Sequence, residues 1–364
     1  MRVALIIVTY NGSSYIDELF ESLITDTYPK EKLGIFVIDN SSMDDTILKI
    51  RGKESRLRRG DGVQSGVRDV VVIQNSDNRF FAVAVNQGAS AAILRGYEML
   101  IILNQDTRIV PGWITEMLWV ANQNSEIAVV QPRLMLFPFG SGVVNSIGNE
   151  VFYLGHGFCG GYLRQWEGMS QQQLRYWDIV SPSGAAMMLS AKIWCEIGGF
   201  DESLQMYYED QDLGWKLRLM GKRMVCARDA VVYHRQQSQP SGLAYYFLQR
   251  NRLLVVLSYY QIKTIILLLP LLILAELGAL IGAFQKRRFH EKLRAFKDMI
   301  LLLPVIYHKR RYVSTKRKVS DRVILEGMLQ EIHNVSLKDS FLLRYIANPL
   351  FGLYYRLLLW IIWW

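Results

Sequence analysis

The chain has 364 residues, 51% of them apolar and 21% charged, so it is too long for one ordinary domain and too apolar to be disordered. Three cysteines without a Cys-x-x-Cys spacing provide neither a disulfide framework nor a thiolate zinc site, and they favour a reducing compartment. A net charge of +9 would suggest nucleic acid if it were spread over the chain.

The positive charge is instead concentrated in two C-terminal segments. Residues 285–297 contain six Lys/Arg and one Glu, and residues 308–322 contain seven Lys/Arg and one Asp, so these segments carry +11 and the rest carries −2. Basic stretches between apolar ones are typical of a membrane surface, because anionic lipid attracts each nearby Lys or Arg by about 1 kcal/mol. We therefore expect an anionic membrane surface as a partner, and no nucleic acid.

The N-terminal two thirds of the chain alternate apolar runs with amphipathic stretches. The apolar runs that fit buried strands are residues 3–8, 33–38, 69–74 and 99–103. The first of them is too short to cross a bilayer, so no signal peptide is expected. Helical patterns such as residues 83–99 lie between the runs, and this predicts an α/β domain whose mainly parallel sheet binds ligands at the carboxyl ends of its strands. Residues 51–66, which are polar and Gly-rich, predict a flexible insertion.

Polar side chains follow three of these predicted strands. They are Thr9, Tyr10 and Asn11 after the first, Asp39 and Asn40 after the second, and Asn104, Gln105 and Asp106 after the fourth. Because the carboxyl ends of parallel strands meet at one edge, their carboxylates form a natural site for a divalent cation and the phosphates that it bridges. The alternative is that Asp39 and Asp44 are turn and helix-cap residues, the commoner use of an isolated Asp at such positions.

Four ordered motifs bear on this choice. They are VTYNG at 8–12, VIDNSSMDDT at 37–46, ILNQDT at 102–107 and GGFDESLQMYYEDQDLGWKLRLMG at 198–221. Over roughly residues 3–235 the chain resembles family-2 glycosyltransferases with the GT-A fold, a Rossmann-like sheet flanked by helices. The similarity is greatest to the prokaryotic rhamnosyltransferase-like branch, in which a Leu-Asn-x-Asp-Thr motif replaces a plain Asp-x-Asp.

The resemblance implies a nucleotide site. In the family the Thr-Tyr-Asn segment and the Asp that closes the second strand hold the nucleotide, and here these residues are Thr9, Tyr10, Asn11 and Asp39. A carboxylate at this place accepts the N3–H of uracil or thymine and rejects cytosine, which has no such donor. The expected donor is therefore a TDP- or UDP-sugar.

The resemblance also implies a metal site. Asp106 matches the metal ligand of the Asp-x-Asp motif, Asn104 stands where many relatives have the first Asp, and His234 matches a His that completes the site in relatives. One strong carboxylate fits Mg²⁺ or Mn²⁺ held mainly through the diphosphate, and an imidazole ligand favours Mn²⁺. Without the motif, a lone His at a strand end is more often a hydrogen-bonded structural residue.

The catalytic assignment rests on the run Tyr-Tyr-Glu-Asp-Gln-Asp ahead of the helical pattern 213–220. In the resembling enzymes the Asp of the Glu-Asp pair is the general base, which here is Asp210, with Glu209 as the substitute candidate. Inversion in one displacement needs only one such carboxylate, and backbone N–H groups at a helix start stabilise an anion. The alternative is an acidic helix cap without a catalytic role.

Further donor contacts follow from the same resemblance. Gly184 opens a strand that floors the donor-sugar pocket in relatives, where a glycine allows close approach of the backbone to the sugar. Relatives carry Gly-Phe-Ala-Gly-Gly-Asn-Asn where this chain has residues 80–86, so three glycines are lost and Asn86 remains. The aromatic residues Tyr162, Trp166 and Trp177 are candidates for stacking on sugars, although core packing is their commoner use.

The composition changes after about residue 240. Residues 243–263 alternate aromatic, basic and aliphatic side chains at helical spacing, and Arg250 and Arg252 lie where processive relatives have a helix beside the acceptor. They are candidates for holding a lipid diphosphate or the donor diphosphate. Snorkelling arginines on an interfacial helix are an equally good interpretation.

Residues 265–284 form an apolar run about as long as a bilayer requires. Nucleotide sugars are cytoplasmic, so one crossing would put the +11 of residues 285–322 outside, against the positive-inside tendency. Glu276 near the middle adds a cost of roughly 2–3 kcal/mol. We expect monotopic or re-entrant attachment at the cytoplasmic face, with a spanning helix as the alternative.

Together these features predict two domains, a GT-A glycosyltransferase domain at residues 1–242 and a helical membrane-associated region at residues 243–364. The predicted function is inverting, metal-dependent transfer of a sugar, such as rhamnose, from a nucleoside diphosphate to a hydroxyl of a glycan or polyprenyl-linked acceptor. A polyprenyl-phosphate sugar synthase is the first alternative. The second is a non-catalytic membrane scaffold that binds sugar nucleotides.

Overall fold

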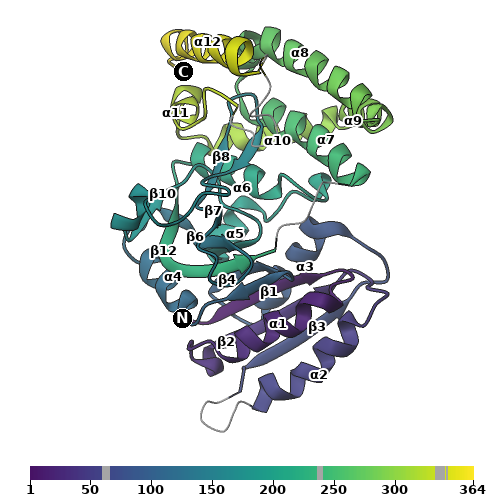
Figure 1. Cartoon of the computed structure of the whole chain (residues 1–364), viewed down its shortest axis with the longest axis vertical. Helices are drawn as coiled ribbons and strands as arrows, with labels where there is room; N and C mark the ends of the chain where they lie inside the picture. Colours follow the sequence, from purple (N-terminus) through teal and green to yellow (C-terminus); the bar gives the residue numbers. More distant parts are fainter. Residues whose placement is uncertain (60–65, 236–240, 333–340, 342) are drawn as a thin grey trace. The chain divides into compact units, whose positions relative to one another are not determined.

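The computed structural model describes residues 1–59, 66–235, 241–332, 341 and 343–364 (Figure 1). They belong to two compact units. Unit 1 comprises Met1–Gly148, Cys159–Leu213 and Arg223–Gln236, and unit 2 comprises Asn149–Phe158, Gly214–Lys222 and Gln237–Trp364. Unit 2 therefore takes in two short segments of the N-terminal sequence as well as the C-terminal third.

Unit 1 is built on a ten-stranded sheet. Its main strands, in spatial order, are β10 (Tyr176–Asp178), β12 (Arg223–His234), β6 (Ile127–Leu136), β11 (Ala186–Ser190), β4 (Met99–Asn104), β1 (Val3–Thr9), β2 (Leu33–Asp39) and β3 (Asp69–Gln74), while β5 (Thr107–Ile109) pairs with β12 and β7 (Val144–Ser146) with β6. Strands β3, β2, β1 and β4 are parallel, as the apolar runs predict. Strand β11 is antiparallel to both β4 and β6, so the other half of the sheet is mixed.

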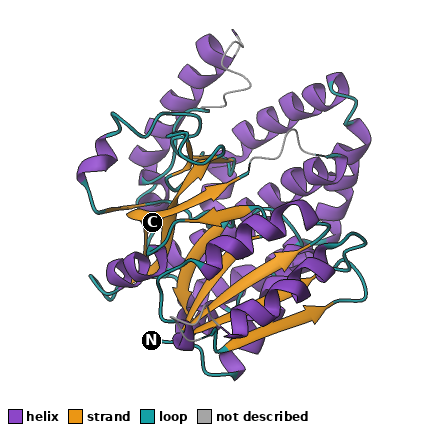
Figure 2. Cartoon of the chain, turned by 60° about the horizontal axis from the view of Figure 1, so that its bottom comes forward, coloured by secondary structure: helices purple, strands orange, loops and turns teal. Residues whose placement is uncertain are grey.

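Helices cover both faces of this sheet (Figure 2). They are α1 (Ser13–Ile24), α2 (Thr46–Arg59), α3 (Phe80–Leu94), α4 (Trp113–Ala121), α5 (Ala191–Ile197) and the start of α6 (Glu209–Leu219), with 3-10 turns η1 (Lys30–Lys32), η2 (Ser170–Gln173) and η3 (Glu202–Leu204). Alternate residues of β1 face opposite sides. Leu5 joins the core under α1, α2 and α4, whereas Ile6 meets α3. A Cβ on Gly88 of α3 would lie 2.6 Å from Ile6, so a glycine is required for this close packing.

The prediction of a flexible insertion at residues 51–66 is wrong for residues 51–59, which are helical. Helix α2 continues to Arg59 because its basic side chains form ion pairs with carboxylates on α2 itself and on α1. Lys53 and Arg56 both bind Glu21 of α1 at 2.7 Å, and Arg58 binds Glu54 one turn earlier at 2.8 Å. Residues 60–65 lie outside the described residues.

Unit 2 consists of helices packed around a hairpin. The helices are α7 (Gly242–Tyr259), α8 (Ile262–Gln285), α9 (Phe289–Leu301), α10 (Leu303–Lys316), α11 (Asp321–Glu326) and α12 (Asn348–Ile361), with a π-helical turn at Leu343–Ala347 and the last part of α6. The hairpin strands are β8 (Asn149–Val151) and β9 (Gly157–Cys159). At its tip Phe152, Tyr153 and Leu154 are fully buried. The Tyr153 hydroxyl donates to the carbonyl of Phe351 at 3.1 Å, which ties the tip to α12.

Helix α8 is, within the described residues, the one helix long and apolar enough to cross a membrane. One stripe of it is exposed, formed by Ile266, Leu269, Ile273, Leu277, Ile281 and Phe284. Glu276 lies on the inner side, where its carboxylate is 2.6 Å from Lys292 of α9 and also pairs with Arg252 of α7. The acidic side chain of this apolar helix is thus neutralised inside unit 2.

Candidate active site

The parallel strands β1, β2 and β4 end side by side. Thr9 is level with Asp39, and Val8 is level with Asn104. The Thr9 hydroxyl donates to the Asp39 carboxylate at 3.0 Å, and the backbone N–H and hydroxyl of Ser42 donate to it at 3.0 and 2.5 Å. Asp39 is only 1% exposed, so its carboxylate is fixed in place by the two strand ends.

The turn after β1 is held by the loop after β2. Asn11 has a φ of 46°, and its amide oxygen accepts the backbone N–H of Met43 at 2.9 Å. Asp44 accepts the N–H of Ser13 at 3.1 Å and of Thr46 at 3.1 Å. Burial raises the pKa of Asp44, but the hydrogen bonds from Thr46 and Ser13 outweigh it and hold that pKa at about 2. The turn-and-cap interpretation therefore describes Asp44 well.

Gln105, the central residue of the Asn-Gln-Asp motif, connects the ends of β4 and β1. Its amide oxygen accepts the N–H of Tyr10 at 3.0 Å, and its amide nitrogen donates to the Tyr10 carbonyl at 3.1 Å. A Cβ on Gly12 would lie 2.1 Å from the Gln105 amide oxygen, so glycine makes room for this side chain. The position of Gln105 directly after a strand was a signal for this role in the sequence.

The predicted metal ligands Asp106 and His234 lie together. The Nε2 atom of His234 is 3.4 Å from the Asp106 carboxylate, and β12 pairs His234 with Thr107 of β5. The Nδ1 atom of His234 is 3.2 Å from the amide oxygen of Asn145. Because a carbonyl oxygen only accepts hydrogen bonds, this contact favours a proton on Nδ1 and leaves the Nε2 lone pair facing Asp106.

This pair fits a divalent cation. Two electron-rich atoms 3.4 Å apart repel each other unless a proton or a cation lies against both. Within the described residues no group of three or more His, Cys, Asp or Glu side chains converges. Asp106 and His234 would therefore make only a partial set of protein ligands, which a metal would complete with water or with phosphate oxygens.

Asp210, the candidate base, is connected to the same edge of the sheet. Its Oδ2 accepts the backbone N–H of Gly184 at 2.9 Å, and its Oδ1 accepts the N–H of Gln211 at 2.7 Å. Next to Gly184, the carbonyl of Ala185 accepts the N–H of Asn104 at 2.9 Å. The strand that starts after Gly184 thus links Asp210 to the Asn-Gln-Asp motif.

The neighbouring Glu209 has a different environment from Asp210. Burial raises the pKa of both carboxyl groups, and for Glu209 the negative charges of Asp210 and Asp212 add to that effect and bring it to about 8. The backbone N–H groups of Gly184 and Gln211 partly oppose the rise at Asp210. The Oε2 atom of Glu209 is buried and has no hydrogen-bond partner among the residues that the structure describes. These environments favour the proton on Glu209 and the negative charge on Asp210.

Two tyrosines ahead of this pair adopt a strained backbone. Tyr207 and Tyr208 have φ values of 65° and 72°, in the left-handed region that bulky side chains rarely occupy. Such strain persists only where the surrounding structure imposes it, and it is concentrated at functional sites. The strained backbone of Tyr207 and Tyr208 therefore marks this segment as a candidate functional site, and the sequence did not show this strain.

The other predicted donor contacts have structural partners. The amide nitrogen of Asn86 donates to the Phe200 carbonyl and to Glu202, each at 3.0 Å, and its oxygen accepts the N–H of Phe200. Asn86 therefore positions the loop that precedes Asp210. A donor contact from Asn86 stays a prediction.

Arg250 and Arg252 belong to unit 2 and are buried, with 5% and 1% exposure. Arg250 donates to the Tyr246 hydroxyl at 3.2 Å, and Arg252 donates to the Leu154 carbonyl at 2.7 Å and pairs with Glu276. Side chains this deeply buried do not snorkel. Their contact with a diphosphate stays a prediction.

Two sequence families match the chain. Glycosyl transferase family 2 matches residues 4–190, and glycosyl transferase family group 2 matches residues 99–364. The chain belongs to glycosyltransferase family 2. The family 2 match at residues 4–190 covers all residues of the strand-end site except Asp210 and His234, and these two lie within the second match.

Curated relatives of this glycosyltransferase are much longer proteins. The O-antigen biosynthesis protein RfbC of Myxococcus xanthus is 28% identical over 251 residues, which are 65% of this chain and 18% of that protein. An uncharacterized protein, y4gI, of Sinorhizobium fredii is 26% identical over 253 residues, 65% of this chain and 24% of that protein. The chain therefore spans about a fifth to a quarter of the length of these relatives.

Solved structures agree on the fold. GalNAc-T7 with UDP, GalNAc and Mn²⁺ has a TM-score of 0.55 at 18% identity, over 72% of this chain and 49% of that one. TarS 1-349 of S. aureus in complex with UDP-GlcNAc has a TM-score of 0.54 at 15% identity, over 99% of this chain and 90% of that one. The predicted GT-A fold with a C-terminal helical region is confirmed.

Proposed function

We propose that this glycosyltransferase moves a hexose or deoxyhexose, with inversion, from a TDP- or UDP-sugar to a hydroxyl group of a glycan precursor. The observation that carries the proposal is that three contacts lie along one edge of the sheet. They are the Thr9–Asp39 hydrogen bond, the Asp106–His234 pair, and the hydrogen bond from the Gly184 N–H to the Asp210 carboxylate. Asp39 would accept the pyrimidine N3–H, and the backbone after Thr9 would contact the ribose and diphosphate.

The metal is proposed to be Mn²⁺ or Mg²⁺, held by Asp106 and His234. When bound, it would neutralise the charge that develops on the departing nucleoside diphosphate. Asn145 would keep the His234 ring oriented through its 3.2 Å contact with Nδ1. GalNAc-T7 has been solved with UDP and Mn²⁺, and it shares only the fold with this chain.

Asp210 is proposed to take the proton of the acceptor hydroxyl. As that O–H bond breaks, the oxygen forms a bond to the anomeric carbon, and the bond from that carbon to the diphosphate oxygen breaks on the opposite side. One displacement of this kind inverts the anomeric centre. The raised pKa of Asp210 makes it a stronger base than an ordinary Asp while Glu209 remains protonated.

The proposal is tested by product analysis. Purified protein with Mn²⁺ is incubated with a UDP- or TDP-sugar and either a lipid-linked saccharide or bare polyprenyl phosphate, and the new linkage is assigned by NMR. We expect transfer to the saccharide, with anomeric configuration opposite to that of the donor. Transfer to polyprenyl phosphate alone would make the protein a polyprenyl-phosphate sugar synthase, and donor binding without any transfer would make it a scaffold.

Asn145→Leu is expected to weaken Mn²⁺ binding about 10- to 100-fold, because the His234 ring loses the partner that orients it. The measurement is a Mn²⁺ titration followed by electron paramagnetic resonance, with UDP present. Asn145→Asp keeps an acceptor at the same place and should retain the wild-type affinity. Equal affinity in wild type and Asn145→Leu would remove Asn145 from the proposal.

The pH dependence of kcat/KM is expected to have two limbs. Activity should fall on acidification with a midpoint above the ordinary Asp value, because burial raises the pKa of Asp210 and only its ionised form is a base. Activity should fall again above about pH 8, where Glu209 loses its proton and adds a second negative charge beside the diphosphate site. Glu209→Gln should abolish the alkaline limb and keep the acid limb. An alkaline limb unchanged in Glu209→Gln would contradict this assignment.

Attachment to the cytoplasmic face of a membrane is the second part of the proposal. It is supported by the exposed apolar stripe of α8 and by the exposed Trp360 and Trp363 near the C-terminal end, next to segments that carry +11. The inward pairing of Glu276 with Arg252 and Lys292 favours a helix lying in the interface over one that crosses alone. RfbC, which matches part of this chain, is described as an O-antigen biosynthesis protein.

A protease experiment tests this topology. In inside-out vesicles a C-terminal tag should be digested, because in monotopic attachment the tag and the catalytic unit share the outer, cytoplasmic face. A tag on the N-terminus is the control and should be digested in either case. Protection of the C-terminal tag would mean that α8 crosses the bilayer.

A further inference from the structure

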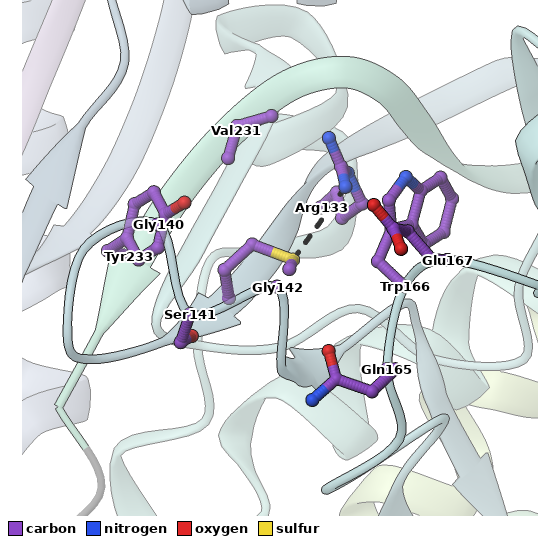
Figure 3. A pocket seen from close by; sticks show the side chains of 10 residues that line it. Arg133, Gly140, Ser141, Gly142, Gln165, Trp166, Glu167, Val231 and Tyr233 are labelled. Atoms are coloured by element: carbon purple, nitrogen blue, oxygen red, sulfur yellow. Dashed lines mark hydrogen bonds between the residues drawn. The ribbon is translucent and has the colours of Figure 1, made fainter.

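A pocket of about 350 Å³ lies in unit 1 beside strands β6 and β12 (Figure 3). Val231 and Tyr233 of β12 line it, and His234, the next residue, faces the opposite side of the strand. Its other walls include the charged residues Arg133 of β6 and Glu167, and also Ser141, Gln165 and Trp166. This volume is within the range of small-molecule sites, roughly 300–1,000 Å³, and the proposed transfer reaction makes no use of it.

Arg133 is a half-buried cation on the wall of this pocket. Its Nε donates to the carbonyl of Arg228 at 3.0 Å, its Nη1 is 3.8 Å from the sulfur of Met135, and its guanidinium lies 4.2 Å from the centre of the Trp166 ring. Among the residues that the structure describes, no carboxylate oxygen comes within 4.0 Å of it. Glu167 lines the same pocket but makes no ion pair with Arg133, so among the described residues the guanidinium has no counter-charge in direct contact.

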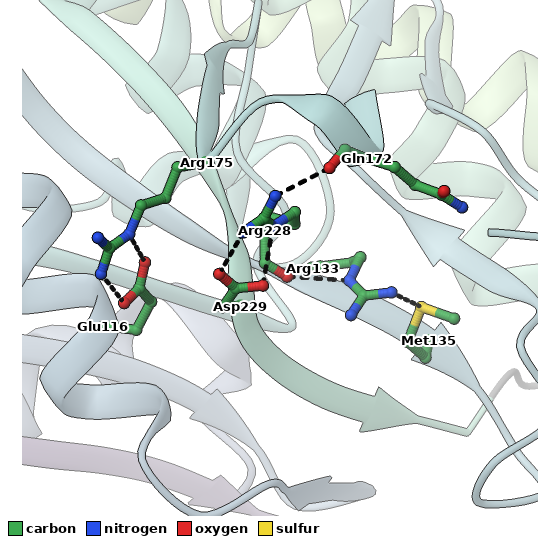
Figure 4. Close-up of polar contacts among 7 residues, drawn as sticks. All are labelled: Glu116, Arg133, Met135, Gln172, Arg175, Arg228 and Asp229. Atoms are coloured by element: carbon green, nitrogen blue, oxygen red, sulfur yellow. Dashed lines mark hydrogen bonds and ion pairs between the residues drawn. The ribbon is translucent and has the colours of Figure 1, made fainter. Parts of the chain in front are cut away.

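Two arginines near Arg133 are paired in the usual way (Figure 4). Arg175 makes two bonds of 2.9 Å to Glu116, and Arg228 makes two bonds of 2.9 Å to Asp229. Hydrogen bonds donated to these carboxylates raise the pKa of Arg175 and Arg228, whereas burial lowers the pKa of Arg133. A buried charge is costly unless it is paired, so an anion in the pocket would compensate Arg133.

We propose that this pocket binds a saccharide unit that carries an anionic group, a carboxylate or a phosphate, with Arg133 as the counter-charge. The guanidinium is held by stacking on Trp166 and presents its fork to planar or tetrahedral oxyanions. Tyr233, whose ring packs on Phe139 at 4.6 Å, adds an apolar part of the wall, and the Gln165 amide offers hydrogen-bonding groups for sugar hydroxyls.

The pocket would hold an acidic sugar of a glycan at a place separate from the donor. This binding goes beyond the transfer reaction, and it needs neither Asp210 nor the metal ligands. It also gives Trp166 a role different from the one expected from the sequence: Trp166 supports the arginine, because Arg133 lies over one face of its ring and Trp177 stacks with it at 6.1 Å.

Isothermal calorimetry on the full chain tests the proposal with four probes: glucuronate, glucose 6-phosphate, glucose and inorganic phosphate. We expect the two anionic sugars to bind at least tenfold more tightly than glucose or inorganic phosphate. Arg133→Gln should weaken their binding at least tenfold, and Arg175→Gln, which removes an arginine that already has a carboxylate, should change it less than twofold. Binding of glucuronate and glucose 6-phosphate that is unchanged in Arg133→Gln would overturn the proposal. Inorganic phosphate binding as tightly as the sugars would overturn the saccharide part.

Val231→Phe provides a second test that leaves Arg133 in place. The larger side chain would fill part of the pocket, so the anionic sugars should bind at least tenfold more weakly. UDP binding is measured on the same samples and should stay unchanged in both pocket variants, which shows that they are folded. A wild-type protein that does not bind UDP would contradict the proposed function, and the result for the pocket would still hold.

Discussion

Asp210→Asn is expected to lower kcat about 10³- to 10⁴-fold while leaving the dissociation constant of the donor within about threefold. Asparagine has the shape of aspartate and can still accept the backbone N–H of Gly184, which Asp210 does at 2.9 Å. It cannot take the proton of the acceptor hydroxyl. The measurement is release of nucleoside diphosphate at saturating donor and acceptor, with calorimetry of donor binding on the same protein.

Glu209→Gln is the matched control for this prediction. At neutral pH the buried Glu209 is already protonated, since its pKa is raised to about 8, so a neutral amide should change kcat less than about tenfold. If Glu209→Gln were inactive and Asp210→Asn active, the two residues would have exchanged roles. If both variants were active, the base would lie elsewhere.

The second large effect is expected in unit 2. Glu276→Leu should lower the free energy of unfolding by about 3–5 kcal/mol, because it leaves two buried cations, Arg252 and Lys292, without their carboxylate. Both side chains are only 1% exposed, so water cannot take over the role of Glu276. The measurement is chemical denaturation of the detergent-solubilised protein, followed by tryptophan fluorescence.

Two variants show whether the loss comes from the ion cluster. Glu291→Gln removes a carboxylate from a half-buried pair with Arg288, 3.5 Å apart, and should cost less than about 1 kcal/mol. Adding Lys292→Met to Glu276→Leu removes one of the stranded cations and should restore part of the stability. A Glu276→Leu protein as stable as wild type would mean that the carboxylate is not buried among these cations.

The parallel strands β1, β2, β3 and β4 could be predicted from the sequence because they are continuous apolar runs that end at polar residues. Strand β3 has the predicted bounds, Asp69–Gln74, and β1, β2 and β4 each extend one residue past the expected run. Since parallel strands share an edge, the polar ends at Thr9, Asp39 and Asn104 had to meet. Family resemblance then supplied Asp210 and His234, which local pattern alone could not distinguish from a cap and a structural histidine.

The contacts that the sequence could not provide are long-range. Gln105 reaches Tyr10 across 95 residues, and Asn145 reaches His234 across 89. No periodicity encodes such pairs, because side-chain hydrogen bonds depend on how loops are placed by the whole sheet. Glu276 is a similar case: its cost in an apolar helix was predictable, but its partners on α7 and α9 were not.

The central claim, a pyrimidine nucleotide-sugar site at the carboxyl edge of the sheet, is tested most directly by a thermal-shift panel of UDP-, TDP- and GDP-sugars with Mn²⁺. A ligand at 100 times its dissociation constant adds about 2.7 kcal/mol to the stability of the folded state. We predict a higher melting temperature with UDP- or TDP-sugars, reduced in Asp39→Asn and Asp106→Asn, and no change with GDP-sugars. Stabilisation by GDP-sugars alone, or by no nucleotide sugar at all, would contradict the account.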